Sequence, residues 1–476
     1  MLAKQVLGYI PSLLIPAITS FGAIYFYTRL LSTSEFGHYA LTLSTMTLLN
    51  AVFFYWLQTS LPRLMPQAAK AGSGEQLRIT TYLAFAGMTG ALLLIALLTL
   101  TTAPLGNLKE MAALAVPLAL ARSLLNINQA IHLSRMDYKR YNIIECGQSL
   151  IGFIAGIALV YFFGMGNVGA ILGMIFGMTL MAIFDGKMLR GISWKGFDRE
   201  ALRELVRFGV PLIFSFGLGF LISSSDRFII EHFRDAGEVG IYAAGYSLMD
   251  RITVMIFMIV ATPSFPLTVN KLEHEGIEAA RQQTYANGVA IFALILPACA
   301  GLILTTEQLA AFLIGAEFRS GAMQVMPWIA VSAMLNGLSV HYFSHALHLA
   351  KKPALLVVAQ LPSAIVNLGL NFTLIPEYGY MGAVYATMAS YLLLLILTIV
   401  IGQRAFPYRF PFLPLLQIMC CVAAMAAVLK LVSFPISVIG LAAEVISGGV
   451  VYGAGLLLFN VMDIRPRVRK ILARFI

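Results

Sequence analysis

Long apolar segments, about fourteen in number, follow one another along the chain with only short polar stretches between them. The hydrocarbon core of a membrane requires about 20 apolar residues in each spanning helix, and a lipid-exposed backbone must satisfy its own hydrogen bonds. Segments that meet this requirement cover residues 7–31, 36–61, 79–103, 111–131, 143–163, 167–190, 207–229, 239–262, 285–305, 323–349, 353–375, 379–402, 412–433 and 436–460. The pattern therefore predicts an all-α polytopic membrane protein with about 14 transmembrane helices.

Composition agrees with this class and excludes several others. Hydrophobic residues make up 59% of the chain and charged residues only 11%, against about 25% charged residues in a soluble domain. The cysteines lie within predicted spans and form no CxxC motif, so neither a disulfide nor a zinc site is expected. They are Cys146, Cys299, Cys420 and Cys421. No loop is long enough for a soluble catalytic domain, and we expect neither a cofactor nor a metal.

Basic residues mark one side of the membrane. The net charge of +10 would suggest nucleic-acid binding on a soluble face, but here the lysines and arginines fall on alternate loops. The loops after the even-numbered segments carry Arg63, Lys70, Arg78, Arg135, Lys139, Arg140, the stretch 187–207, Lys271, Arg281, Lys351, Lys352, Arg404 and Arg409. The chain ends carry Lys4, Arg465, Arg467, Arg469, Lys470 and Arg474. Because basic loops stay in the cytoplasm, both termini are predicted to be cytoplasmic, with 106–109 and 315–319 outside.

The sequence suggests two similar halves. Glu35-Phe36-Gly37-His38-Tyr39 opens the second segment, and Glu238-Val239-Gly240-Ile241-Tyr242 opens the eighth. Since the match recurs six helices later and six is an even number, the halves would have the same orientation and form a parallel repeat. Between them, Arg199, Arg203 and Arg207 recur at a spacing that predicts a basic amphipathic helix on the inner surface. We expect an N-terminal lobe at 1–190, a cytoplasmic amphipathic linker at 191–207, a C-terminal lobe at 208–402, and two additional helices with a basic tail at 403–476.

Polar side chains within the predicted spans are the candidate functional residues, because ionisable groups at membrane depth usually face a cavity or each other. Arg122, Asn126 and Gln129 share one helix face at i, i+4 and i+7. Asp250 and Arg251 lie near the middle of the segment 239–262, and they are either a structural pair or leave Arg251 facing a cavity.

Other polar positions admit two interpretations each. Arg29 and Arg227 lie near predicted outer helix ends, where they contact substrate or extend to lipid headgroups. Asn367 belongs to a polar stripe suited either to interhelical hydrogen bonds or to substrate contact. Asn336 precedes three histidines at i, i+4 and i+7 that suit interfacial anchoring, or a headgroup or proton role. These histidines are His341, His345 and His348.

The mid-span charges are mainly cationic, and the first segment contains no acidic residue. A cavity for a cationic drug or for Na⁺ needs buried carboxylates. A cavity for a phosphorylated ligand needs guanidinium groups, whose donor geometry matches phosphate oxygens. The charge pattern favours the phosphorylated ligand.

At several helix junctions the chain resembles the multidrug/oligosaccharidyl-lipid/polysaccharide exporter superfamily, specifically its bacterial polysaccharide (O-antigen type) flippase branch. These junctions are Tyr27-Thr28-Arg29-Leu30-Leu31 with Glu35-Phe36-Gly37-His38-Tyr39, Ser225-Asp226-Arg227 with Val239-Gly240-Ile241-Tyr242, and Asn371-Phe372-Thr373-Leu374-Ile375-Pro376 with Gly379-Tyr380-Met381-Gly382-Ala383. The resemblance implies two six-helix lobes related by a parallel pseudo-two-fold axis, plus two C-terminal helices.

The resemblance also implies a function, which is not enzymatic. It implies that the protein moves an undecaprenyl-pyrophosphate-linked oligosaccharide from the cytoplasmic to the periplasmic leaflet by alternating access, for surface polysaccharide such as the O-antigen of lipopolysaccharide. The location would be the bacterial inner membrane. Partners would be the lipid-linked oligosaccharide, membrane lipids, and polysaccharide polymerase and chain-length proteins, with no nucleic acid. The expected substrate-binding residues are Arg122, Arg251, Arg29, Arg227, Asn126, Gln129, Asn336 and Asn367.

The sequence also bears on what drives transport. No GxxxxGK[ST] motif occurs, so nucleotide hydrolysis by this chain is not expected. Asp250 is the best candidate for a coupling carboxylate, although the adjacent Arg251 would hold it ionised.

Three alternatives remain. A multidrug and toxin extrusion type cation antiporter would need acidic groups that the first half lacks at mid-span. A lipid II flippase would use the same mechanism on a peptidoglycan precursor. A membrane glycosyltransferase or polymerase would need a large loop with catalytic carboxylates.

Overall fold

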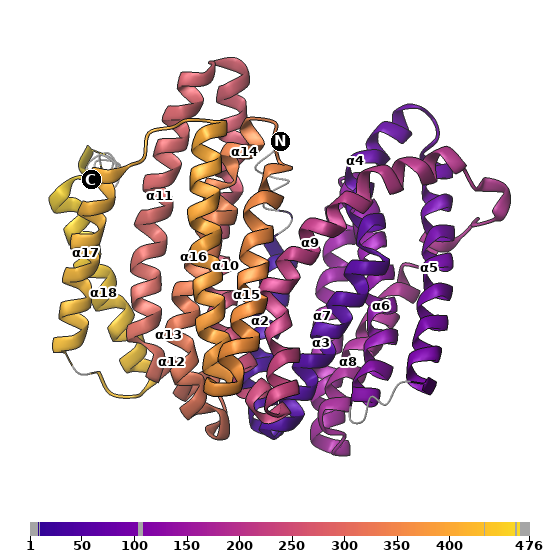
Figure 1. Ribbon diagram of the computed structural model, residues 1–476, viewed down its shortest axis with the longest axis horizontal. Coiled ribbons are helices and arrows are strands. Elements are labelled where there is room, and N and C mark those ends of the chain that lie inside the picture. Colours follow the sequence, from indigo (N-terminus) through magenta and orange to yellow (C-terminus); the bar gives the residue numbers. More distant parts are fainter. Residues whose placement is uncertain (1–7, 9, 103–107, 433, 462–463, 467–476) are drawn as a thin grey trace. The chain divides into compact units, whose positions relative to one another are not determined.

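The computed structural model describes residues 8, 10–102, 108–432, 434–461 and 464–466 (Figure 1). Lys4, Arg467, Arg469, Lys470, Arg474 and residues 106–107 of the loop predicted outside lie beyond the described residues. Within the described part of the chain, every regular element is helical. The elements are α2 (Ile10–Leu30), α3 (Thr33–Phe53), α4 (Tyr55–Lys70), α5 (Gly74–Thr102), α6 (Leu108–Ser134), α7 (Tyr138–Phe163), α8 (Gly166–Phe184), η1 (Gly186–Leu189), η2 (Trp194–Gly196), α9 (Arg199–Phe233), α10 (Ala236–His274), α11 (Ile277–Leu304), α12 (Thr306–Leu313), α13 (Ala316–Leu338), η3 (Ser339–Phe343), α14 (His345–Leu349), α15 (Leu355–Tyr378), α16 (Tyr380–Ala405), α17 (Phe412–Leu431) and α18 (Val438–Phe459).

The number of spans agrees with the sequence pattern. Among the described residues, 13 helices are long and apolar enough to cross a membrane, and α3 with α4 makes a fourteenth if this bent pair is one span. The prediction of an all-α polytopic membrane protein with about 14 helices is confirmed.

The predicted span 36–61 is broken rather than straight. α3 and α4 meet at an angle of 54°, and Phe54 occupies the break with its side chain fully buried. Its ring lies 5.2 Å from the ring of Phe85, in a cluster with Leu92 and Val116. Burial of this aromatic ring stabilises the bend, which an apolar run by itself does not reveal.

The predicted amphipathic helix within 191–207 is continuous with the following span. Residues from Arg199 onward form the first turns of α9, which has 35 residues. At about 1.5 Å per residue this helix is longer than the hydrocarbon core is thick. Ala201 and Leu205 are buried in a cluster with Leu57 and Leu61 of α4, so the basic face points away from that packing. The predicted lobe boundaries stay a prediction.

The contacts divide the chain into two compact units, residues 1–240 and 241–476. In the first unit, α7 and α8 form the tightest helix pair (Figure 1). A Cβ atom on Gly173 would overlap the backbone of Gly156, and one on Gly177 would overlap that of Gly152. Glycines on facing sides let two membrane helices approach to backbone contact, where dispersion and weak polar contacts hold them.

The second unit contains the helices predicted as an additional pair. α17 and α18 pack on each other and on α11, and α15 and α16 form a neighbouring hairpin against which α13 packs (Figure 1). Tyr452 of α18 donates a hydrogen bond of 2.6 Å to the carbonyl oxygen of Ala293 in α11. The pair is thus attached to this unit both by apolar packing and by a specific polar contact.

Candidate functional site

Arg122 lies near the middle of α6 in the first unit and is half-buried. Its guanidinium forms no hydrogen bond or ion pair with any residue that the structure describes. A charged side chain at membrane depth without a counter-ion is costly. Arg122 therefore has the character of a group whose partner is a ligand or water rather than another side chain.

The two amides predicted on the same face are engaged with neighbouring helices. Asn126 Nδ2 donates to Gln58 Oε1 of α4 at 3.0 Å. Gln129 Nε2 donates to Glu145 Oε2 of α7, which also accepts from Gln148 Nε2 at 2.9 Å. These contacts are hydrogen bonds between helices, from α6 to α4 and from α6 to α7. On this face only Arg122 keeps its donors unused by described residues.

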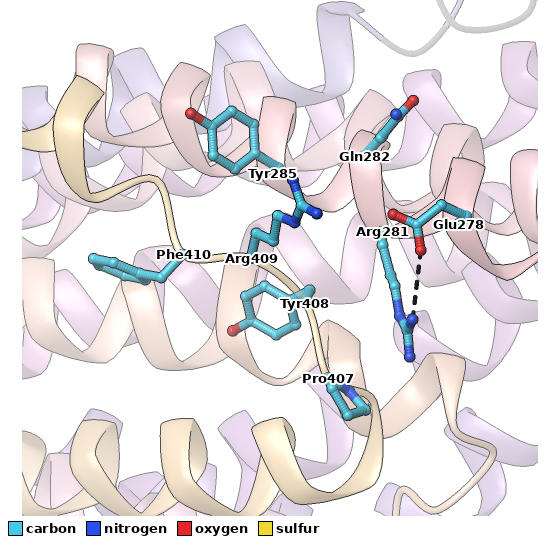
Figure 2. Close-up of a pocket in the computed structure, with 8 residues that line it drawn as sticks. All are labelled: Glu278, Arg281, Gln282, Tyr285, Pro407, Tyr408, Arg409 and Phe410. Carbon is cyan, nitrogen blue, oxygen red and sulfur yellow. Dashed lines mark hydrogen bonds and ion pairs between the residues drawn. The ribbon is translucent and has the colours of Figure 1, made fainter.

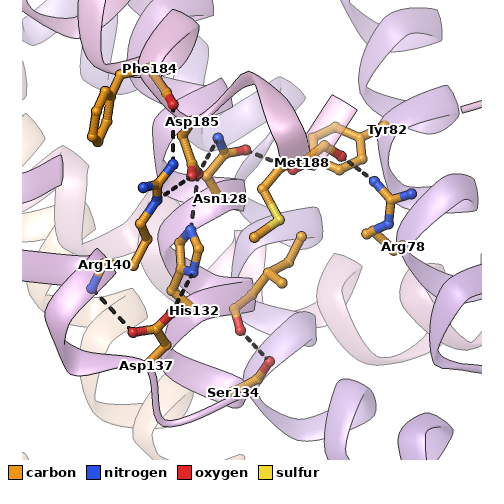
Figure 3. A network of polar contacts seen from close by, with 11 residues as sticks. Arg78, Tyr82, Asn128, His132, Ser134, Asp137, Arg140, Phe184, Asp185 and Met188 are labelled. Atoms are coloured by element: carbon orange, nitrogen blue, oxygen red, sulfur yellow. Dashed lines mark hydrogen bonds and ion pairs between the residues drawn. The ribbon is translucent and has the colours of Figure 1, made fainter. Parts of the chain in front are cut away.

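Asp185, at the end of α8, is the centre of a polar network that the sequence pattern did not reveal (Figure 3). Its carboxylate is almost completely buried and accepts from Asn128 Nδ2 at 3.0 Å and from Arg140 Nε at 2.9 Å. His132 Nε2 lies 2.9 Å from the same carboxylate and, facing an ionised acceptor, donates to it. Burial raises the pKa of Asp185, but the hydrogen bonds and charges of His132 and Arg140 outweigh this and lower it. Asp185 is therefore ionised at neutral pH.

The network connects several helices at one end of the first unit. Tyr82 Oη of α5 donates to Asn128 Oδ1 at 2.7 Å. Arg78, also on α5, donates to the carbonyl oxygen of Met188 (Figure 3). It also donates to the carbonyl oxygen of Arg190 and pairs with Glu75. Helices α5, α6, α7 and the segment after α8 are thus held by hydrogen bonds in a region where water competes poorly.

Asp185 and Glu145 lie within the predicted segments 167–190 and 143–163, and the sequence pattern does not single them out. Arg78 and Arg140 were interpreted only as markers of membrane orientation. One available signal was the i, i+4 spacing of Asn128 and His132 near the end of the segment 111–131.

Arg29 and Arg227 belong to the first unit as well. Arg29 is exposed, its guanidinium lies 3.7 Å from the ring centroid of Tyr25, and it donates to the Tyr25 carbonyl oxygen at 2.8 Å. Arg227 is half-buried and donates to Ser44 Oγ at 3.4 Å. Both arginines therefore have protein contacts, and a substrate role for them stays a prediction.

Arg251 lies on α10 in the second unit and is exposed. It forms no hydrogen bond or ion pair with the part of the chain that the structure describes, Asp250 included. Asp250 is half-buried. The coupling role of Asp250 and the binding role of Arg251 stay predictions.

The remaining predicted residues of the second unit are on α13 and α15. Asn336 is half-buried, and its side chain forms no hydrogen bond with a described residue. It precedes η3, a short π-helical segment of the kind that often marks functional sites. Asn367 is fully buried and accepts from Asn371 Nδ2 at 3.0 Å, while its own Nδ2 has no partner among the described residues.

The three histidines pack against aromatic rings. His341 stacks on Phe257 with ring centroids 5.4 Å apart, and His345 lies 4.9 Å and His348 5.9 Å from Phe265. Among described residues, no group of three or more His, Cys, Asp or Glu side chains is placed to hold a metal ion.

A family model described as polysaccharide biosynthesis protein matches residues 26–323, which is more than half of the chain. The chain belongs to this family. It is also 26% identical over 245 residues to the probable low-salt glycan biosynthesis flippase Agl15 of Haloferax volcanii, a match that covers 51% of this chain and 50% of that protein. The chain thus spans about half the length of this curated relative.

Solved structures show the same fold at low sequence identity. The lipid II flippase MurJ in an inward closed conformation matches 96% of this chain and 99% of its own, with a TM-score of 0.76 and 13% identity. An inward-facing multidrug resistance MATE family transporter of the MOP superfamily matches 84% of this chain and 98% of its own, with a TM-score of 0.66 and 14% identity. The superfamily resemblance drawn from the helix junctions is confirmed. Agl15 and MurJ are described as flippases, and the MATE protein as a transporter.

Proposed function

We propose that this protein is a flippase that moves an undecaprenyl-pyrophosphate-linked oligosaccharide from the cytoplasmic to the periplasmic leaflet by alternating access. The observation that carries the proposal is Arg122, a half-buried guanidinium near the middle of a membrane helix without a described partner. Its donor geometry suits two oxygens of one phosphate group, and a pyrophosphate offers several such pairs.

Two acids of the first unit, Asp185 and Glu145, favour this class over a cation antiporter. Asp185 is saturated by three donors, and Glu145 accepts from two amides. Carboxylates engaged in this way are poorly available to coordinate a cationic substrate. The fold itself is common to both classes, so the distinction rests on these charges.

The remaining parts of the proposal follow the family and the charge distribution. Both termini are proposed to lie in the cytoplasm of a bacterium, with the protein in its inner membrane and O-antigen or a related surface polysaccharide as the product. The lobes are proposed at 1–190 and 208–402. Arg251, Asn336 and Asn367 are proposed to contact the lipid-linked oligosaccharide in the second lobe.

A lipid II flippase is the second candidate, because MurJ covers nearly the whole chain in fold. The two substrates share a polyprenyl pyrophosphate and differ in the head group. Complementation of a strain depleted of its peptidoglycan flippase separates the candidates. Rescue of growth would favour lipid II as the substrate, and absence of rescue would favour the polysaccharide precursor.

The proposal is tested in reconstituted vesicles that contain a polyprenyl-pyrophosphate-linked oligosaccharide, with a membrane-impermeant sugar-modifying reagent as the reporter. Loss of a hydrogen bond to a charged group is worth about 1.5–3 kcal/mol, so Arg122→Ala should slow flipping about tenfold or more and Arg122→Lys less. Arg135→Ala is the matched control, because Arg135 is an exposed arginine just after the same helix. Flipping by Arg122→Ala at the control rate would refute the assignment.

A further inference from the structure

The second unit contains a pocket of about 660 Å³ where the start of α11 faces the loop between α16 and α17 (Figure 2). The helix contributes Glu278, Arg281, Gln282 and Tyr285, and the loop contributes the stretch 407–410. None of these residues belongs to the polar faces considered above for the transported substrate.

Hydrogen-bond donors without partners lie on residues that border this pocket. Arg281 Nε and Tyr408 Oη are buried and form no hydrogen bond within the described structure. Arg409 is exposed and pairs with no described residue. Burial raises the pKa of Tyr408, so its hydroxyl keeps its proton at neutral pH. The Tyr408 hydroxyl faces the protein interior beside Tyr342. The guanidinium of Arg409 and the terminal nitrogens of Arg281 are therefore the donors that a ligand in the pocket can reach.

Among the described residues that line the pocket, one side chain is acidic. Glu278 Oε2 lies 3.4 Å from Arg281 Nη1, and both side chains are solvent-accessible, at 65% and 33% exposure. Exposed pairs of this kind contribute little stability, so Arg281 can turn to a stronger acceptor. With two arginines and one glutamate, the lining has a net charge of +1.

The loop that completes the pocket is held in place. Gln403 brackets it, donating from Nε2 to the Tyr408 carbonyl oxygen at 3.1 Å and accepting from the Tyr408 amide at 3.3 Å. The Tyr408 ring lies 5.9 Å from that of Tyr342, and the Phe410 ring stacks on Phe343 at 6.4 Å. The loop that carries Arg409 is therefore positioned by the fold before any ligand arrives, which reduces the entropic cost of binding.

The charge pattern predicts this end of the second unit on the inner side, because Arg281, Arg404 and Arg409 belong to basic loops. Anionic lipids are enriched in that leaflet, and basic pockets between helices there suit their headgroups. Arginine forks match phosphate oxygens, and tyrosines prefer the interface.

We propose that this pocket binds the phosphate of an anionic phospholipid headgroup from the inner leaflet, with Arg281 and Arg409 as the donors. Such binding is independent of which substrate the protein transports. If the lipid site is refuted, the proposed transport function is unaffected, and the reverse also holds. It would attach the α16–α17 loop, and with it the start of the α17–α18 pair, to the membrane surface.

The test is native mass spectrometry of the full chain in detergent with added phosphatidylglycerol, and with phosphatidylcholine as the uncharged comparison. The variant is Arg281→Gln with Arg409→Gln. The matched control is Lys352→Gln with Arg404→Gln, which removes the same charge from exposed positions of the same unit outside the pocket. We expect wild type and control to retain phosphatidylglycerol in preference to phosphatidylcholine. The affinity of the variant for phosphatidylglycerol should be lower by about tenfold or more.

Two further probes identify the source of the phosphate. If inorganic phosphate occupies the site as well as phosphatidylglycerol does, the pocket takes free phosphate and the lipid proposal is wrong. If undecaprenyl pyrophosphate displaces phosphatidylglycerol at equal concentration, the carrier lipid is the preferred ligand and the phospholipid proposal is again wrong. Equal lipid retention by variant and control would overturn any phosphate site here. Arg409→Gln alone keeps the test available if the double variant does not fold, because Arg409 is exposed and without a described partner.

Discussion

Substitution of Asp185 should destabilise the first unit, because one carboxylate serves three donors from two helices. In Asp185→Ala, Asn128 and His132 lose their acceptor while they are 1% and 2% exposed. Each buried donor left without a partner costs about 1–3 kcal/mol. Arg140 can turn toward water because its side chain is 27% exposed. Loss of the ion pair between Arg140 and residue 185 therefore adds little to the destabilisation.

The expected loss in the free energy of unfolding is therefore about 2–4 kcal/mol. The two buried donors together would cost about 2–6 kcal/mol. The lower part of this range applies because polar groups in a membrane often find other partners after unfolding. Asp185→Asn should lose less, since its carbonyl oxygen can still accept from Asn128 and His132. Unfolding by sodium dodecyl sulfate in mixed micelles, followed by circular dichroism, measures the difference. Glu200→Ala, an exposed acid on α9, is the control and should stay within about 0.5 kcal/mol of wild type.

Wild type and Asp185→Ala should also differ in how their stability responds to acid. The pKa of Asp185 is lowered in the folded state, so its contribution is complete above the unfolded-state pKa of about 3.9 and is lost as the pH falls through the folded value. The stability gap between wild type and Asp185→Ala should stay constant from neutral pH down to about pH 5 and narrow only at lower pH. An Asp185→Ala variant as stable as the control at pH 7 would refute the account of the network.

Two other outcomes are expected. Gly173→Val should separate α7 from α8, because its side chain would overlap the backbone of Gly156; we expect a loss of folded protein in size-exclusion chromatography, while Gly87→Val, with open space around its Cβ position, should leave the yield unchanged. In a cysteine-free background, Lys109→Cys should react with an impermeant maleimide in intact cells and Glu200→Cys should not. The reverse labelling pattern would invert the predicted membrane orientation.

Much of the site could be predicted only as a set of positions. The periodicity of α6 placed Arg122, Asn126 and Gln129 on one face, and the structure keeps them there. The sequence could not distinguish among them, since their difference depends on Gln58 and Glu145, which come from other helices. Asp185 was missed for the same reason. Its importance arises from three donors that lie 45 to 57 residues away along the chain.

The fold class was determined by the sequence itself, because a bilayer imposes a length and an apolar composition that each spanning helix must carry locally. Charge alternation between loops is equally local, so a membrane orientation could be predicted without any contact. Tertiary structure alone decided the bend at Phe54, the contact of Gly156 with Gly173, the saturation of Asp185 and the donor-lined pocket at Tyr408. Each of these depends on which side chains from distant segments meet in a closely packed interior, where a single partner determines whether a polar group is satisfied or free.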